Sequence, residues 1–187
     1  MWWEIVVYSS NRVYRAKSSL GTLPQPLHRI VVGFQANFST INIMLIGEYK
    51  HTLDPKKRLS VPSKWRMDLG DKLVVTRGIG NCLFVYPLSE WKKITDKLGD
   101  LSLGTADTRS FNRFFLSGAV EVEVDSVGRI LVPDFLKEFA NLDSKVVLAG
   151  IHNRIEIWDE TKWNEYKAKI ELEADSLAEK LGAIGVL

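Results

Sequence analysis

The chain contains little of what marks secreted, membrane-spanning or metal-binding proteins. Cys82 is the one cysteine among 187 residues, which excludes an intrachain disulfide and suits a reducing cytosol. No uninterrupted apolar run approaches the roughly 18 residues that a transmembrane helix needs. His28, His51 and His152 have no metal-ligand spacing among themselves or with Cys82. We therefore expect neither a membrane partner nor a bound metal.

The usual sequence features of an enzyme are also missing. No glycine-rich phosphate loop precedes a predicted helix, and the short Gly78-x-Gly80 segment indicates a hairpin turn. Glu121 and Glu123 share one face of a predicted strand, which an exposed strand explains better than a carboxylate pair for acid–base catalysis. Cys82 is predicted to be a core residue rather than a nucleophile. We expect no catalytic residue, no cofactor and no small-molecule substrate.

Acidic residues are nearly absent from positions 1–43, where four basic residues stand against Glu4 alone. The segment is rich in serine and contains Leu23-Pro24-Gln25-Pro26. A strand is expected at Trp3 to Tyr8, without an obvious partner. Three interpretations remain open, namely translation from a misassigned upstream start codon, a targeting peptide and a genuine extension. We favour the first, with Met44 as the natural first residue, because the patterning changes there.

An internal duplication follows Met44. A shift of 71 residues superimposes five positions of the chain on identical residues: Gly47 on Gly118, Asp54 on Asp125, Arg58 on Arg129, Val61 on Val132 and Pro62 on Pro133. After one inserted residue, a shift of 72 aligns another set: Asp71 with Asp143, Val74-Val75 with Val146-Val147, Gly78 with Gly150, Asn81 with Asn153 and Trp91 with Trp163. Chance does not keep so many matches in one register. The predicted organisation is an atypical N-terminal extension at 1–43, repeat one at 47–92, a helical linker at 93–117, repeat two at 118–163 and a C-terminal helix or tail at 164–187.

Each repeat has the same order of predicted elements. A strand, a tight turn and a second short strand lead to a helix, and two more strands joined by a hairpin turn close the unit. Pro62 and Pro133 are expected at the first helical position, and Ser89 and Asp159 are expected to cap the following helices. The short helices are predicted at Ser63 to Leu69 and Asp134 to Ala140. A unit of this size buries little core alone, so we expect the two to pack about a pseudo-twofold axis in an α+β, β-rich fold.

Basic residues concentrate around the first turn. Residues 50–66 contain six basic residues and one acidic residue, although the stretch as a whole is equally typical of a solvated face. The turn Asp54 to Arg58 carries Lys56, Lys57 and Arg58, and its copy ends in Arg129. Cations on exposed hairpin turns can reach phosphates, and arginine also pairs with guanine in the major groove. Solubility and turn geometry are the alternative explanation.

The other repeated turn residues have structural explanations. Asp54 and Asp125 cannot contact phosphate favourably, so we expect them to accept turn N–H groups or to orient the arginines. Gly128 permits a positive φ in a tight turn. Lys57 takes its place in the first turn, at a cost of about 1 kcal/mol if the backbone is the same.

These features together make the chain resemble the MraZ family from Met44 to about Trp163. The resemblance rests on five groups of residues: Met44-Leu45-Ile46-Gly47-Glu48-Tyr49; Leu53-Asp54 with Arg58 and Pro62; Arg113-Phe114-Phe115 with Gly118-Ala119; Asp125 with Gly128-Arg129 and Pro133; and Glu156-Ile157-Trp158. It implies tandem SpoVT/AbrB-like units of the swapped-hairpin type, packed as a pseudo-twofold β-barrel with flanking helices. Lys57 departs from the glycine that many members have.

The resemblance also implies a function. Family members assemble as rings and bind direct repeats in the DNA upstream of the division and cell-wall gene cluster that they begin. The DNA-contacting motif maps onto Asp54 to Arg58 and Asp125 to Arg129. The expected protein is a cytoplasmic, nucleoid-associated transcriptional regulator and homo-oligomer whose partner is double-stranded promoter DNA. The alternative is a ring-forming protein-interaction module without specific DNA binding, which the slightly acidic composition of residues 44–187 favours.

Overall fold

The computed structural model describes residues 3–9, 12–18, 43–102 and 104–186, with side chains from residue 43 onward. The chain divides into two compact units, Met1–Thr40 and Ile41–Leu187. In the first unit, β1 (Trp3–Ser9) pairs antiparallel with β2 (Arg12–Ser18). The strand expected at the N-terminus therefore has a partner, which the sequence did not reveal because hydrophobic patterning alone does not specify strand pairing.

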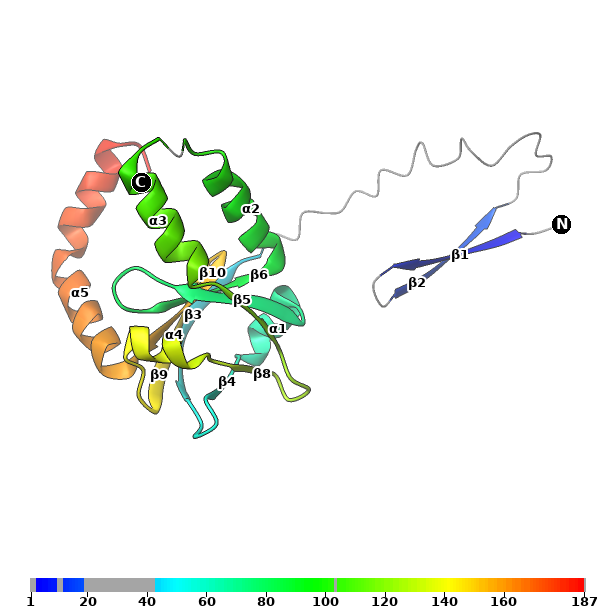
Figure 1. The fold of residues 1–187 in the computed structure, drawn as a ribbon, viewed down its shortest axis with the longest axis horizontal. Coiled ribbons are helices and arrows are strands. Elements are labelled where there is room, and N and C mark those ends of the chain that lie inside the picture. Colours follow the sequence, from blue (N-terminus) through cyan, green and yellow to red (C-terminus); the bar gives the residue numbers. More distant parts are fainter. Residues whose placement is uncertain (1–2, 10–11, 19–42, 103, 187) are drawn as a thin grey trace. The chain divides into compact units, whose positions relative to one another are not determined.

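The second unit holds the two repeats and their helices (Figure 1). Repeat one contains β3 (Leu45–Thr52), β4 (Arg58–Ser60), α1 (Ser63–Leu69), β5 (Lys72–Arg77) and β6 (Leu83–Pro87), followed by α2 (Leu88–Gly99). The linker helix is α3 (Ala106–Ser117). Repeat two contains β7 (Val120–Glu123), β8 (Arg129–Leu131), α4 (Asp134–Ala140), β9 (Lys145–His152) and β10 (Arg154–Asp159), followed by α5 (Glu160–Ala183). The α+β, sheet-rich class is confirmed.

The sheet order is symmetric about an axis between the repeats. Six strands follow one another as β3-β9-β10-β6-β5-β7, and exchanging each strand with its counterpart in the other repeat gives the same order reversed. The first strand of each repeat pairs with a strand of the other repeat, β3 with β9 and β7 with β5. The remaining strands, β4 and β8, form a separate two-stranded sheet. The sequence led us to expect a β-barrel. Between Leu45 and Asp159, the strands form one six-stranded and one two-stranded sheet.

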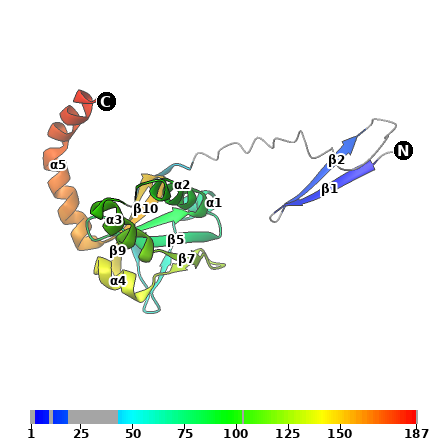
Figure 2. The same cartoon turned by 45° about the horizontal axis from the view of Figure 1, so that its top comes forward.

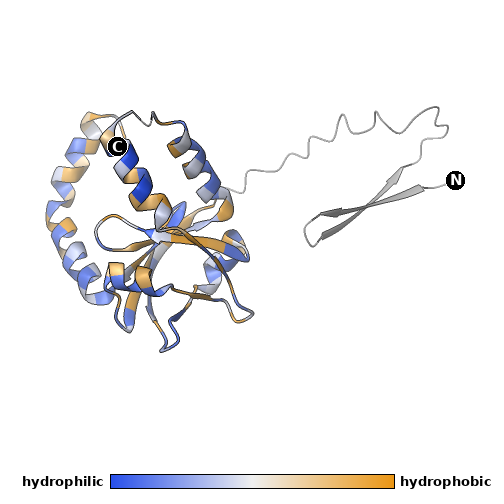
Figure 3. Cartoon of the chain, in the orientation of Figure 1, coloured by the Kyte–Doolittle hydropathy of each residue, from blue (hydrophilic) through white to orange (hydrophobic). Residues whose placement is uncertain are grey.

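The core lies between these sheets and α1 and α4. Hydrophobic residues concentrate on the strands, whereas the helices alternate between polar and apolar positions (Figure 3). Leu59 of β4 and Ile130 of β8 are 0% and 2% exposed. The indole of Trp65 is also buried, at 4.7 Å between ring centroids from Tyr49. Because each repeat contributes one strand of the small sheet, neither repeat completes this core alone.

A second apolar cluster lies beneath α2 and α3. It contains Cys82, Phe84, Tyr86, Phe115 and Trp158. Helix α5 begins directly after β10, and its C-terminal part projects beyond the sheet (Figure 2). None of the described helices is long and apolar enough to cross a membrane.

Helix starts differ in detail from the predictions. Pro62 and Pro133 occupy the N-cap, one residue before the expected position, because their ψ angles of 130° and 145° are extended rather than helical. The expected cap Ser89 was wrong, since Pro87 holds that position and α2 begins at Leu88. Asp159 does cap α5, where its side chain accepts from the N–H groups of Thr161 and Lys162.

Candidate nucleic-acid interface

The turn from Asp54 to Arg58 is held together by the aspartate. The Asp54 carbonyl accepts from Lys57 N–H at 2.8 Å, and Asp54 N–H donates to the Arg58 carbonyl at 3.0 Å. One carboxylate oxygen accepts from the Arg58 backbone N–H at 2.9 Å, and the other accepts from Arg58 Nε at 2.7 Å. These contacts, led by the backbone N–H, hold the pKa of Asp54 below its ordinary value. The carboxylate therefore stays ionised and aims the guanidinium.

The turn from Asp125 to Arg129 repeats this geometry. Asp125 accepts from the Arg129 backbone N–H at 2.9 Å and from Arg129 Nε at 2.8 Å. It also accepts from Val127 N–H at 3.1 Å. The Arg129 side chain is the largest cause that lowers the pKa of Asp125. Both aspartates thus serve the turn and its arginine, as the residue types led us to expect.

The residue before the arginine of each turn has a left-handed backbone. The φ angle is 60° at Lys57 and 82° at Gly128. Three-residue hairpin loops commonly place a left-handed residue at this point, which explains the glycine in the second turn. Lys57 adopts the same conformation despite its side chain, and its ammonium contacts Asp134 at the start of α4. The difference in sequence therefore leaves the shape of the first turn unchanged.

The small sheet brings the two arginines onto one surface. Arg58 lies opposite Leu131, Leu59 opposite Ile130, and Ser60 opposite Arg129. Opposed residues share a face and neighbours alternate, so burial of Leu59 and Ile130 turns both arginines outward. Positions that are diagonal in this way lie about 7–8 Å apart. We call this surface, with the exposed residues of both turns, the ladder face.

The ladder face is accessible. The side chains of Arg58 and Arg129 are 36% and 30% exposed, and Lys56 is exposed at the first turn. Leu131 of β8 is an exposed apolar residue on the same side, and Val127 of the second turn is also exposed. Figure 1 shows both turns protruding from the body on the side away from α2 and α3.

Comparison with known proteins finds the same two-part organisation. A family model described as "MraZ protein" and as antitoxin-like matches residues 44–114 and again 115–182. This chain belongs to the MraZ family. It is 50% identical over 143 residues to a protein named transcriptional regulator MraZ from Clostridium beijerinckii, covering 76% of this chain and all of the relative. Similar proteins with that name occur in Caldanaerobacter subterraneus (49% identity; 74% of this chain, 96% of the relative) and Acetivibrio thermocellus (46%; 76% and 100%).

One cation beside the ladder face of this MraZ protein was missed as a candidate. Arg66 of α1 lies outside both turns, yet its guanidinium packs on Gly128 of the second turn, where a Cβ would overlap it. Its Nε donates to the Val61 carbonyl at 2.9 Å. The charge run around the first turn contained Arg66, but no local pattern linked it to a turn of the other repeat.

Among the residues of this MraZ fold that the structure describes, Cys82 and the Glu121–Glu123 pair do not belong to a reactive site. Cys82 is buried immediately before β6, and burial raises the pKa of its thiol to about 12, so it is a core residue as predicted. Glu121 and Glu123 are exposed and both contact Lys72. No group of three or more potential metal ligands occurs in the described part of the chain.

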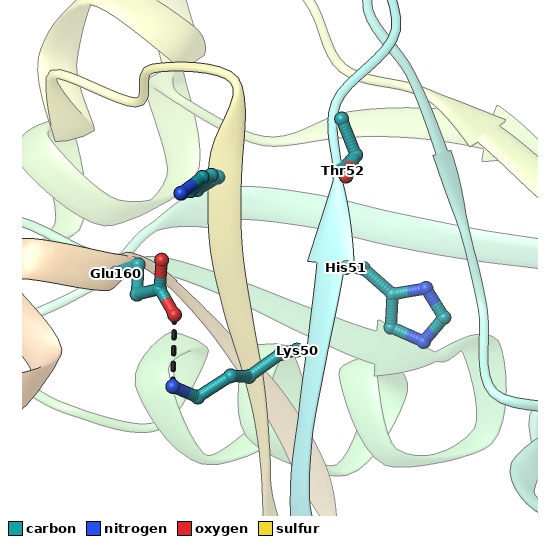
Figure 4. A pocket seen from close by; sticks show the side chains of 5 residues that line it. Lys50, His51, Thr52 and Glu160 are labelled. Atoms are coloured by element: carbon teal, nitrogen blue, oxygen red, sulfur yellow. Dashed lines mark ion pairs between the residues drawn. The ribbon is translucent and has the colours of Figure 1, made fainter.

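A small hollow of about 220 Å³ lies where β3 and β9 meet the start of α5, and it is lined by Lys50, His51, Thr52, Lys145 and Glu160. Lys50 and Glu160 form an ion pair at 2.8 Å across it. Figure 4 shows the imidazole of His51 on the opposite side of β3 from that pair. The two charged groups that face each other across the hollow are therefore paired with one another, and the imidazole does not join them.

Proposed function

We propose that this chain is a transcriptional regulator that binds double-stranded promoter DNA through the ladder face. The observation that carries the proposal is the placement of Arg58 and Arg129 on one exposed side of the β4–β8 pair. A two-stranded ribbon fits the major groove, where arginine pairs with guanine. The names of the relatives support regulation of transcription. We infer no enzymatic activity.

The two turns contribute different groups to the proposed DNA contact. Asp54 contacts Nε of Arg58, whereas Asp125 contacts both Nε and one terminal nitrogen of Arg129. Each guanidinium keeps at least one terminal nitrogen that its aspartate does not contact, and this nitrogen can donate to a base edge or a phosphate. Lys56 and Lys57 lie beside Arg58 in the first turn; Lys56 adds an exposed charge there, and the Lys57 ammonium contacts Asp134. Asp54, Asp125 and Gly128 support the turns and do not contact DNA.

The finer parts of the proposal rest on the family resemblance. The chain assembles into a ring of identical subunits, in the cytoplasm and associated with the nucleoid. The ring presents ladder faces at regular spacing to direct repeats in its own upstream region, at the start of a division and cell-wall gene cluster. Several weak contacts on consecutive repeats then add up to useful affinity.

The test is a fluorescence-anisotropy titration of the full chain. The labelled duplex carries the DNA directly upstream of the chain's own gene, and a shuffled duplex of equal composition is the comparison. We expect the Arg58→Ala/Arg129→Ala variant to lose most of the affinity and to have a smaller dependence of affinity on salt, because ion release accompanies each phosphate contact. Arg113→Ala is the matched control, since it removes an exposed arginine from α3.

Unchanged affinity in the double variant would contradict the proposal. Equal binding to both duplexes, and only at low salt, would favour the protein-interaction module instead. A thermal melt of each variant shows whether a weaker complex reflects a missing DNA contact or an unfolded chain.

A further inference from the structure

We propose that Arg66 is a third guanidinium of the DNA-binding surface and that it contacts a backbone phosphate beside the second turn. This inference rests on the proposed function and adds to it a residue from outside both turns. It also makes the two turns unequal, because the structure gives this neighbour to the second turn only.

The position of Arg66 is fixed by contacts to both repeats. Its Nε donates to the Val61 carbonyl, directly after β4, while Val61 N–H donates to the Gly128 carbonyl at 2.9 Å. The guanidinium lies against Gly128, in the space that a side chain there would fill. Arg129 is the next residue, so Arg66 lies at the edge of the ladder face.

The charge of Arg66 is available to a ligand. Arg58 and Arg129 each contact an aspartate, whereas no carboxylate partner of Arg66 occurs among the described residues, and its side chain is exposed. Its Nε is engaged by Val61, and its two terminal nitrogens have no hydrogen-bond acceptor in the described part of the chain. A rigidly placed guanidinium with free donors suits a phosphate oxygen.

The equivalent place at the first turn is built differently. Lys137 is the counterpart of Arg66, and Lys57 stands where the second turn has Gly128. The Lys57 side chain points to Asp134, so the first turn has no open glycine surface on which a guanidinium could pack. The same backbone therefore carries a lysine–aspartate pair at one turn and an unneutralised arginine at the other.

Two substitutions separate a phosphate contact from a purely structural brace. Arg66→Gln keeps a donor for the Val61 carbonyl and removes the charge, whereas Arg66→Lys keeps the charge. Binding of the full chain to the labelled upstream duplex is titrated at several salt concentrations between about 50 and 200 mM. Arg113→Ala is again the control, and thermal melts check the fold.

We expect Arg66→Gln to lower the slope of log affinity against log salt by about 0.9 for each phosphate that Arg66 neutralises in the wild type. The loss of affinity should be equal on upstream and shuffled duplexes, because a phosphate carries no sequence information. Arg66→Lys should retain the slope. An unchanged slope in Arg66→Gln would overturn the inference even if affinity fell, because a brace changes affinity without releasing fewer ions.

The proposed function can fail separately. If Arg58→Ala/Arg129→Ala loses binding while Arg66→Gln keeps the wild-type slope, only the role of Arg66 is rejected. If none of these variants differs from the wild type, the ladder face itself is not the DNA-binding surface and both proposals fall.

Discussion

Replacing Gly128 with alanine tests whether the second turn depends on the space above its glycine. Two effects add at this position. The φ angle of 82° is strained for any residue with a Cβ, and the new methyl group would overlap the Arg66 guanidinium. The first turn holds Lys57 in the same left-handed conformation. A turn of this kind therefore accepts a side chain when no guanidinium covers the position.

The expected magnitude follows from these interactions. A left-handed backbone costs a non-glycine residue about 1–2 kcal/mol. Displacing Arg66 also breaks its hydrogen bond to the Val61 carbonyl, and such a bond contributes about 0.5–1.5 kcal/mol net. Gly128→Ala should therefore lower the free energy of unfolding by about 2–3 kcal/mol. In an Arg66→Ala background only the backbone effect remains, so the same change should cost about 1–2 kcal/mol.

The assay is urea unfolding monitored by tryptophan fluorescence, at one protein concentration because association would stabilise the folded chain. The four proteins form a double-mutant cycle: wild type, Gly128→Ala, Arg66→Ala and the double variant. A coupling of about 1 kcal/mol is expected from the hydrogen bond that both single variants remove. Equal costs of Gly128→Ala in both backgrounds would refute the packing of Arg66 on this turn.

Two further predictions concern titratable side chains outside the ladder face. The Cys82 thiol should resist alkylation in the folded chain at pH 8 and react after unfolding in urea, because burial raises its pKa to about 12; fast labelling of the folded chain would contradict this. Burial, followed by the nearby Arg66, holds the pKa of His51 below its usual 6.5, so the unfolded chain takes up this proton first and stability should fall as pH drops below about 6.5. His51→Gln should flatten that part of the stability–pH curve, and a curve that matches the wild type would reject the role of His51.

Local patterning was enough to predict the short elements of each repeat. The helices at Ser63–Leu69 and Asp134–Ala140 lie where they were predicted, because proline and apolar spacing are local signals. The left-handed turn at Gly128 was likewise indicated by its glycine. The duplication further predicted that two matching units would pack together, and the symmetric sheet order agrees with it.

Local sequence patterns did not predict the contacts between residues that lie far apart in the chain. Pairing of β3 with β9 joins segments from different repeats, and hydrophobic alternation does not say which strand a given strand will meet. For the same reason, Gly128 indicated a turn but not that Arg66 would cover it. The pairing of Lys57 with Asp134 also depends on how α4 approaches the first turn. The DNA-contacting roles of Lys56, Lys57, Arg58 and Arg129 stay predictions.

The ladder of β4 and β8 joins one short strand from each repeat, and covalent fusion changes what such a pair can become. In a dimer of identical chains, every substitution occurs twice, so both turns must change together. Within a single polypeptide, one turn can hold lysine and the other glycine in the same backbone conformation. Each half can therefore change its turn residues independently of the other while the backbone stays nearly symmetric. Under the proposed function, this independence lets the two halves contact different halves of an asymmetric DNA sequence.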